Sequence, residues 1–244
     1  MPLFSILAAK YSIFLVDAGY KGYLRAFMET THEMIQKQRL KKIGVVHPDL
    51  SGNLEATRAK SLNKDAHENQ PSSFYMLKKA FRRMRIKSKN INMLDIGCGT
   101  GRVLTFGMLQ GFERVRGVDL DEEGLQKAIA NCSKMKEKGY HTAFEIGAAD
   151  ACEMNIPSEV NVIYMFNPFG EKTMEVVLGN IIRHVKETGK VLHVIYSNPM
   201  HQAVYEKHPE VTKIYESFFK SGKADVAIYR VTDQQSRVTN GSHS

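Results

Sequence analysis

The stretch Leu94-Asp-Ile-Gly-Cys-Gly-Thr-Gly-Arg-Val-Leu104 decides the fold of this chain. A short apolar strand is expected to end at Asp95, and an apolar helical pattern resumes at Val103. A glycine-rich turn between a strand and a helix lets a ligand approach the backbone where a side chain would block it. The dinucleotide-binding version of this turn reads G-x-G-x-x-G, whereas here Arg102 occupies the place of its third glycine. The three glycines present give the spacing G-x-G-x-G: Gly97, Gly99 and Gly101.

A second acid follows the next predicted strand, Val115-Arg-Gly-Val-Asp119, and lies eighteen positions after Gly101. In doubly wound folds a carboxylate about 20 residues beyond the glycine turn accepts hydrogen bonds from ribose hydroxyls. This spacing makes Asp119 the best single candidate for a ligand contact; the alternative is that it caps the following helix. Asp121 is predicted to be the N-cap of that helix, with its side chain accepting from free amides of the first turn.

Two further strand ends carry polar residues in the same order along the chain. Asp150-Ala151 follows a strand-like segment at Thr142 to Ile146, and Asn167-Pro168-Phe169 ends a mostly apolar run that starts at Val160. Because ligands bind outside the carboxyl ends of parallel strands, both groups are expected at the ligand-binding edge of a sheet. The simpler interpretations are a turn-favouring Asp at position 150 and a proline at position 168 that stops the strand.

The run from Asp95 to Gly101 resembles the first motif of the class I S-adenosylmethionine-dependent methyltransferases. The resemblance covers roughly residues 70–232 and implies S-adenosylmethionine as the cofactor. It implies that the glycine turn packs against the methionine part and that Asp95 supports the turn or the cofactor's amino group. Asp150 would receive the adenine amine, and the amide of Ala151 would contact the ring. The implied cofactor-binding residues are Asp95, Gly97, Cys98, Gly99, Thr100, Gly101, Asp119, Leu120, Asp150, Ala151 and Asn167.

The Asn-Pro-Phe segment resembles the Asn-Pro-Pro-aromatic motif of methyltransferases that modify planar amines, with one proline fewer. It fits better a branch of the superfamily that has a similar Asn-Pro-Phe at this site. The resemblance implies a catalytic set of Asn167, Pro168 and Phe169, in which the Asn side chain and the Pro carbonyl accept from an amine and the ring stacks on it. An oxygen or carbon acceptor would need a general base, and the sequence identifies none.

The remaining pattern alternates between helices and strands as an α/β fold demands. Apolar stripes predict helices over residues 125–135 and 174–185, the second closed by Gly189 as a C-cap. A fifth strand is expected at 191–196, then a helix at 200–207 and two strands joined at Ser221-Gly222. The expected fold is Rossmann-like, with a mostly parallel seven-stranded sheet, an antiparallel C-terminal hairpin and a helical N-terminal extension. Residues 1–69 form the extension and a lid-like loop, 70–232 the methyltransferase domain, and 233–244 a flexible tail.

Two segments of the extension carry many apolar residues. Leu3 to Val16 is too short to span a membrane, and we interpret it as a helix docked on the core, with an interfacial membrane anchor as the alternative. An amphipathic helix is predicted next, ending near the basic segment 37–42, and residues 44–70 are interpreted as a loop or lid. The apolar positions of this helix are Leu24, Phe27, Met28, Thr31 and Ile35.

Charge supports a second hypothesis about the substrate. The net charge is +8, and seven Lys and Arg residues with no acid occupy positions 78–89, a surface that would attract phosphates. An RNA or DNA base is therefore an alternative acceptor, although no nucleic-acid-binding module is recognisable and the segment also fits a solvated helix face, with Leu77, Phe81 and Met84 as its buried side. A non-catalytic S-adenosylmethionine-binding regulatory subunit is a further alternative.

Three dispersed cysteines and scattered histidines suggest reduced thiols in the cytoplasm and no metal site. Cys98 lies inside the glycine turn, so its alkylation is expected to block cofactor binding. Tyr164 and Tyr196 alternate with apolar residues and are predicted to be core. The cysteine pattern thus predicts a cytoplasmic protein, and the family resemblance implies methyl transfer to an acceptor, with an amine nitrogen as the candidate atom, on a protein side chain, a small molecule or, as the alternative, a nucleic-acid base.

Overall fold

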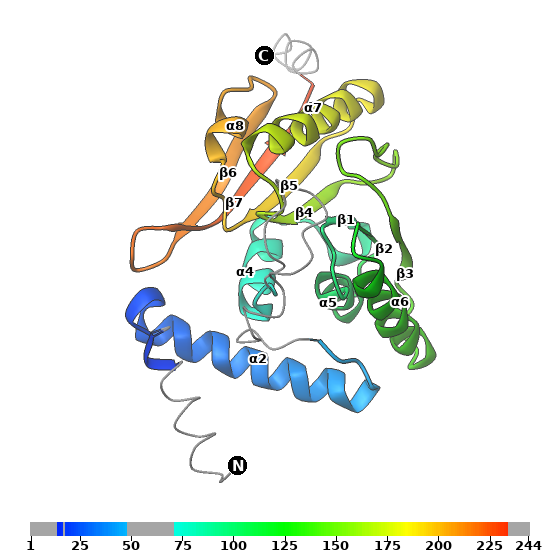
Figure 1. Cartoon of the computed structure of the whole chain (residues 1–244), viewed down its shortest axis with the longest axis vertical. Coiled ribbons are helices and arrows are strands. Elements are labelled where there is room, and N and C mark those ends of the chain that lie inside the picture. The colour runs from blue at the N-terminus through cyan, green and yellow to red at the C-terminus, as the bar shows by residue number, and fades with distance from the viewer. Residues whose placement is uncertain (1–13, 17, 48–70, 234–244) are drawn as a thin grey trace, which may run out of the picture.

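The computed structural model describes residues 14–16, 18–47 and 71–233. Its centre is a seven-stranded sheet with strand order β3-β2-β1-β4-β5-β7-β6 (Figure 1). The first five strands in this order are parallel, and β7 runs antiparallel to both β5 and β6. The strands are β1 Asn92–Ile96, β2 Arg114–Asp119, β3 Ala143–Ala148, β4 Val162–Phe166, β5 Leu192–Ser197, β6 Val211–Phe218 and β7 Ala224–Val231.

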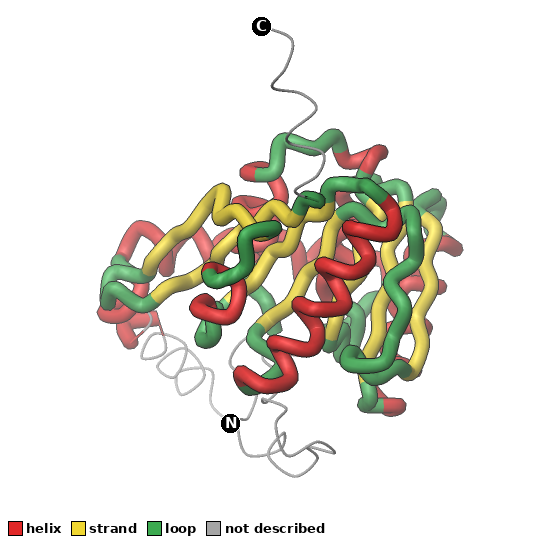
Figure 2. Tube along the Cα trace, turned by 90° about the horizontal axis from the view of Figure 1, so that it is seen from above, coloured by secondary structure: helices red, strands yellow, loops and turns green. Residues whose placement is uncertain are grey.

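Helices cover both faces of the sheet, as the view in Figure 2 shows. Helices α4, α5 and α6 share one buried apolar cluster with one face of the sheet, and α7 and α8 share a second cluster with the other face. This explains the near-continuous apolar sequence of β1 and β4, because a strand buried on both faces has no solvent-facing positions. The helices are α2 Tyr23–Ile43, α4 Phe74–Arg83, α5 Arg102–Gln110, α6 Glu122–Glu137, α7 Glu171–Thr188 and α8 Gln202–Glu206, with a 3-10 turn at Ser88–Asn90.

The predicted fold class is confirmed: the sheet is mostly parallel and ends in an antiparallel hairpin. Gly189 ends α7 in the left-handed conformation, as expected for a C-cap. The predicted strand at 142–146 extends two residues further, and α8 is shorter than the helix expected at 200–207. The segment Leu3 to Val16, the lid-like loop from position 48 and the tail after 233 fall almost wholly outside the described residues.

Helix α2 is present where an amphipathic helix was predicted. Its apolar positions point outward and not toward the core: Leu24 is 78% exposed, Phe27 59% and Ile35 52%. The inward face carries Glu29 and Glu33, both buried, because their carboxylates find basic partners on α2 itself and on other elements. No helix in the described part of the chain is long and apolar enough to cross a membrane.

Candidate functional site

The glycine turn joins β1 to α5, and its three glycines adopt left-handed backbone conformations. Gly97, Gly99 and Gly101 have φ angles of 80°, 49° and 75°, which side-chain-bearing residues rarely adopt. A Cβ on Gly101 would lie 2.9 Å from the Cβ of Ala128, so glycine is also required there for α5 to approach α6. A Cβ on Gly97 would lie 3.5 Å from the Cβ of Pro168. The turn and the Asn-Pro-Phe segment, distant in sequence, are therefore neighbours.

Asp119 ends β2 and its carboxylate holds the glycine turn from the side. Its Oδ2 accepts from the amide of Gly99 at 2.7 Å, and its Oδ1 accepts from the amides of Leu120 and Asp121 at 2.7 and 3.0 Å. The aspartate thus also fixes the chain at the start of α6, in line with the alternative interpretation, and its contact with a ligand stays a prediction. Asp121 is the N-cap by position, but its side chain makes no capping hydrogen bond, contrary to prediction. The side chain that bonds the backbone at the start of α6 is that of Asp119, through the amides of Leu120 and Asp121.

Asp95 is the most unusual ionisable group of the site. It is 2% exposed, and its Oδ2 has no hydrogen-bond partner in the part of the chain that the structure describes. Burial, reinforced by the negative charge of Asp119, raises the pKa of Asp95 well above its ordinary value. A buried carboxyl without a partner is costly unless a ligand supplies one. Its position at the entrance to the glycine turn identifies it as a candidate ligand-binding group.

Cys98 is a packing residue of the turn rather than an accessible thiol. It is 6% exposed, and a Cβ on Gly117 of β2 would lie 2.8 Å from its Sγ. Burial raises the pKa of the Cys98 thiol far above its ordinary value, so the reactive thiolate is scarce. Alkylation of Cys98 in the folded protein should therefore be slow, and its effect on cofactor binding stays a prediction.

Asp150 and Ala151 lie after β3, at the same edge of the sheet. The Oδ1 of Asp150 accepts from the amide of Cys152 at 2.8 Å, which shapes a tight turn. Ala151 is buried, and its carbonyl lies 3.4 Å from the Nδ2 of Asn180 on α7. The hydrogen bonds of Asp150 and Asn180 thus fix the backbone at this turn. The second carboxylate oxygen of Asp150 makes no hydrogen bond among the described residues.

Asn167, which follows β4, has a strained backbone and a buried side chain. Its φ is +34°, and it is 7% exposed. The hydroxyl of Tyr196 on β5 donates to its Oδ1 at 3.0 Å and itself accepts from the amide of His201 at 3.3 Å. Phe169 is half-buried and packs against the core cluster beneath α7. Strain of this kind in a non-glycine residue persists where surrounding contacts enforce it, and it is common at functional sites.

The two tyrosines predicted to be core are buried, and each also forms polar contacts. Tyr164 contacts the hydroxyls of Ser72 and Ser197 at 2.5 and 3.0 Å. Tyr196 holds Asn167 as described above. Sequence alternation identified their burial correctly and gave no sign of the hydrogen bonds.

Sequence reasoning missed His47, which closes over the glycine turn from the extension. Its Nε2 lies 2.7 Å from the Oγ1 of Thr105, and its Nδ1 lies 3.4 Å from the Oγ1 of Thr100. Asn131 of α6 fastens the same segment by bonding both the amide and the carbonyl of Val46. Burial, together with the charge of Arg102, lowers the pKa of His47 to about 3, so the imidazole is neutral. No motif surrounds His47, and only its proximity to a lid-like segment could have suggested it.

Arg102 links the glycine turn to the extension. Its guanidinium pairs with Glu33 of α2, and its Nε donates to the carbonyl of Ser72 at 2.6 Å. The same group lies 4.1 Å from the centre of the Phe74 ring. The residue that separates this turn from the dinucleotide-binding pattern therefore fixes two N-terminal elements above the turn.

The other candidate groups lie elsewhere in the fold. The segment 78–89 has Leu77, Phe81 and Met84 buried as expected, and most of its basic side chains are exposed. Within the described residues no group of three or more His, Cys, Asp or Glu is placed to hold a metal ion.

Comparison with known proteins agrees with this geometry. Residues 93–189 match the model of the methyltransferase domain family. This span contains the glycine turn, Asp119, Asp150 and Asn167, and it ends at the C-cap of α7. The match supports a methyltransferase with S-adenosylmethionine as its cofactor.

A curated relative and two solved structures extend the comparison. An uncharacterised protein of Methanocaldococcus jannaschii is 27% identical over 140 residues, which cover 52% of this chain and 62% of the relative. A protein of the NADB-Rossmann superfamily from Streptococcus agalactiae is 14% identical with a TM-score of 0.50, covering 68% of this chain and 71% of that one. TrmN from Thermus thermophilus is 15% identical with a TM-score of 0.50, covering 66% of this chain and 49% of its own. Both structures support the Rossmann-like fold.

Proposed function

We propose that this protein transfers a methyl group from S-adenosylmethionine to an amine nitrogen by in-line displacement. The observation that carries the proposal is the buried carboxyl of Asp95, whose Oδ2 has no hydrogen-bond partner among the described residues and which directly precedes the glycine turn. A cationic amino group bound there would form the missing hydrogen bond and offset the cost of burying the carboxylate. The residues present therefore fit the amino-acid end of this cofactor.

The remaining cofactor contacts follow from the same edge of the sheet. The Oδ1 of Asp119 already accepts from two backbone amides, whereas its Oδ2 accepts from one and keeps a further lone pair for a ribose hydroxyl. Leu120, 40% exposed, and Ala151 would flank the adenine, and Asp150 would accept from its amine. When bound, the cofactor supplies an electrophilic methyl group on a sulfonium. The chain contributes by holding the donor and acceptor close, aligned and shielded from water.

Asn167 and Pro168 are proposed to orient the acceptor. The Oδ1 of Asn167 uses one lone pair for Tyr196, which leaves the other for an N–H of the acceptor. The Pro168 carbonyl provides a second acceptor next to the glycine turn. Two hydrogen bonds to the N–H groups would direct the nitrogen lone pair toward the methyl group. An amine nucleophile needs no general base in this arrangement.

Calorimetry with S-adenosylhomocysteine tests the cofactor site directly. If Asp95 receives the amino group, binding lowers its raised pKa and releases a proton, so the apparent binding enthalpy should depend on the ionisation enthalpy of the buffer. Asp95→Asn should abolish this dependence and weaken binding by about tenfold or more. Absence of binding to the intact protein would refute the cofactor assignment.

Transfer of labelled methyl from S-adenosylmethionine into fractionated cell extract tests the reaction. Label entering protein, RNA or small molecules with the intact protein, and not with Asp119→Ala, would identify the acceptor class. Tight cofactor binding with no transfer into any fraction would contradict the catalytic proposal and favour a regulatory subunit.

A further inference from the structure

The outward face of α2 gathers six exposed apolar side chains on one helix. Its first three and a half turns expose only apolar and uncharged side chains, and its last turn exposes only cations. The apolar side chains are Tyr23, Leu24, Phe27, Met28, Met34 and Ile35, each at least 36% exposed. We call this set the α2 outer face. Isolated apolar side chains are normal on a surface, but a contiguous stripe along one helix indicates an interaction site.

Charge along α2 is separated by face. Both acids of the helix, Glu29 and Glu33, are turned inward and ion-paired with Arg25 and Arg102 respectively. Arg39, Lys41 and Lys42 are exposed at the C-terminal end and form no ion pair among the described residues. The exposed side of α2 therefore combines the uncharged α2 outer face with cations at its C-terminal end, and it exposes no acidic side chain.

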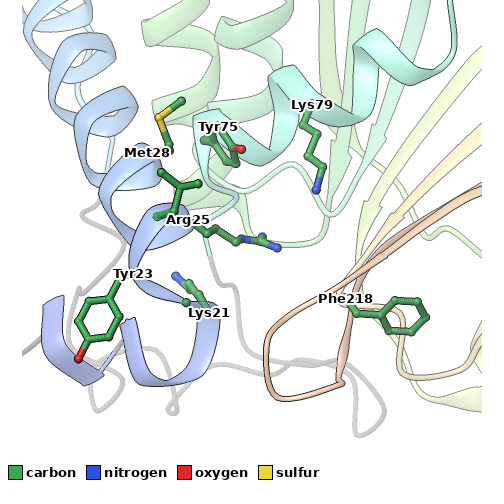
Figure 3. Close-up of a pocket in the computed structure, with 9 residues that line it drawn as sticks. Lys21, Tyr23, Arg25, Met28, Tyr75, Lys79 and Phe218 are labelled. Atoms are coloured by element: carbon green, nitrogen blue, oxygen red, sulfur yellow. The ribbon is translucent and has the colours of Figure 1, made fainter.

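The N-terminal end of α2 adds a basic pocket, shown in Figure 3. Leu24 and Met28 of the outer face line this pocket, together with Tyr75 and Lys79 of α4. Lys21 and Arg25 also line it, but they are ion-paired with Glu29 and Asp225. Lys79 forms no ion pair within the described ranges, and Figure 3 shows its side chain extending into the pocket. Cations thus flank the apolar stripe at both ends.

We propose that the α2 outer face binds an anionic membrane surface, with the helix lying in the plane of the lipid headgroups. An apolar stripe bordered by Lys and Arg is the pattern of an interfacial helix, whose apolar side chains enter the headgroup–acyl boundary while its cations meet lipid phosphates. A second copy of this chain fits the surface less well. Pairing two outer faces would bring no carboxylate to the lysines, because both glutamates of α2 face the domain.

A single introduced tryptophan tests insertion, because the chain contains no tryptophan of its own. Phe27→Trp places the probe in the centre of the outer face, and Val176→Trp, on α7 and 48% exposed, is the matched control. With vesicles of phosphatidylcholine and phosphatidylglycerol, the first variant should show a blue-shifted emission that brominated acyl chains quench. The control should show neither effect. Equal responses of the two probes, or none, would overturn the proposal.

Charge and self-association are tested on the full chain. The double variant Lys41→Glu and Lys42→Glu should bind anionic vesicles about tenfold or more weakly, and added salt should weaken the binding of the unmodified protein. If the unmodified protein binds pure phosphatidylcholine vesicles as tightly as anionic vesicles, the proposed attraction between the cations of α2 and lipid phosphates is wrong. A blue shift of the Phe27→Trp emission that grows with protein concentration without lipid would assign the face to a second copy. That outcome would refute the membrane proposal.

Discussion

Arg102 and Glu33 form a buried ion pair that joins the first residue of α5 to the middle of the N-terminal helix α2. The side chains are 5% and 10% exposed. The arginine also bonds the carbonyl of Ser72 and stacks over Phe74. The guanidinium of Arg102 therefore fastens the middle of α2 to the start of α5, directly after the glycine turn, in addition to the contacts that His47 makes there.

Removing one partner of this pair should be costly. Glu33→Ala removes a carboxylate that pairs with the buried Arg102 guanidinium, and we expect a loss of about 3 kcal/mol in the free energy of unfolding. Urea denaturation measures it. The exposed pair of Glu123 and Lys127 is the matched control, and Glu123→Ala should leave stability unchanged. Loss of stability equal in both variants would show that burial of the Arg102 pair has no special role.

Asp119→Ala should weaken S-adenosylhomocysteine binding by at least tenfold, as measured by calorimetry. The change removes the proposed ribose acceptor and also the carboxylate that orders the amide of Gly99. Asp121→Ala is the control, because its side chain makes no capping bond. Affinity retained in Asp119→Ala would remove this residue from the cofactor site.

The strands and the glycine turn could be predicted because each leaves a local signal. Apolar runs ending in Asp95, Asp119 and Asn167 mark strand ends, and the parallel connections bring those ends to one edge. The family resemblance assigned roles to these positions in the expected order. Local periodicity, turn chemistry and fold topology agree over this part of the chain.

The extension could not be predicted in the same way because its contacts are distant in sequence. Glu33 is buried only because Arg102 lies 69 positions away, and His47 meets Thr105 at a separation of 58. The stripe containing Leu24 and Phe27 has the spacing of a core-facing helix, yet two ion-paired glutamates occupy the core side. Hydrophobic periodicity identifies a helix but does not show which partners its polar face will meet.

Asp95 should give the protein a distinct dependence of stability on pH. Its pKa is raised in the folded state, so the folded protein holds the proton more tightly than the unfolded chain. The resulting stability is fully present below the unfolded pKa of about 4 and is lost as pH rises through the raised pKa. Relative to Asp95→Asn, the free energy of unfolding should fall by up to about 1.4 kcal/mol per pH unit in this window.

Urea denaturation of both proteins at a series of pH values above 4 tests this expectation, since the contributions of other groups cancel in the difference. The charge of Asp119 contributes to the raised pKa of Asp95, so Asp119→Asn should lower that pKa. The fall in the free energy of unfolding should then end at a lower pH. A difference between wild type and Asp95→Asn that is independent of pH would show that Asp95 is ionised throughout.

Thiol alkylation should distinguish the three cysteines by burial. Cys152 is half-buried, whereas Cys98 and Cys132 are buried. Burial raises the pKa of Cys132 to about 12 and that of Cys98 still further, so both thiolates are scarce near neutral pH. Iodoacetamide at mildly alkaline pH should modify Cys152 first, with mass spectrometry of peptides as the readout. Rapid labelling of Cys98 in the folded protein would contradict the packing of the glycine turn.

Tyr196 is expected to position Asn167 for the proposed reaction. Burial raises the pKa of Tyr196 to about 12, so the phenol keeps its proton, and because its oxygen accepts from the amide of His201 the proton is donated to Asn167. This bond fixes the Asn167 amide with Oδ1 toward Tyr196. Tyr196→Phe should lower kcat about tenfold, the effect of losing one hydrogen bond in an aligned site, and leave S-adenosylhomocysteine affinity unchanged.

Tyr164→Phe provides the matched control for this prediction. Tyr164 is equally buried on the neighbouring strand, but its hydroxyl bonds Ser72 and Ser197 rather than Asn167. Its removal should reduce stability by about 1 kcal/mol and leave kcat unchanged. If both variants lower kcat equally, the effect belongs to general packing of the sheet and Tyr196 has no positioning role. If Tyr196→Phe alone lowers kcat while Asn167→Ala has no effect, the tyrosine acts without the asparagine, and the proposed acceptor geometry is wrong.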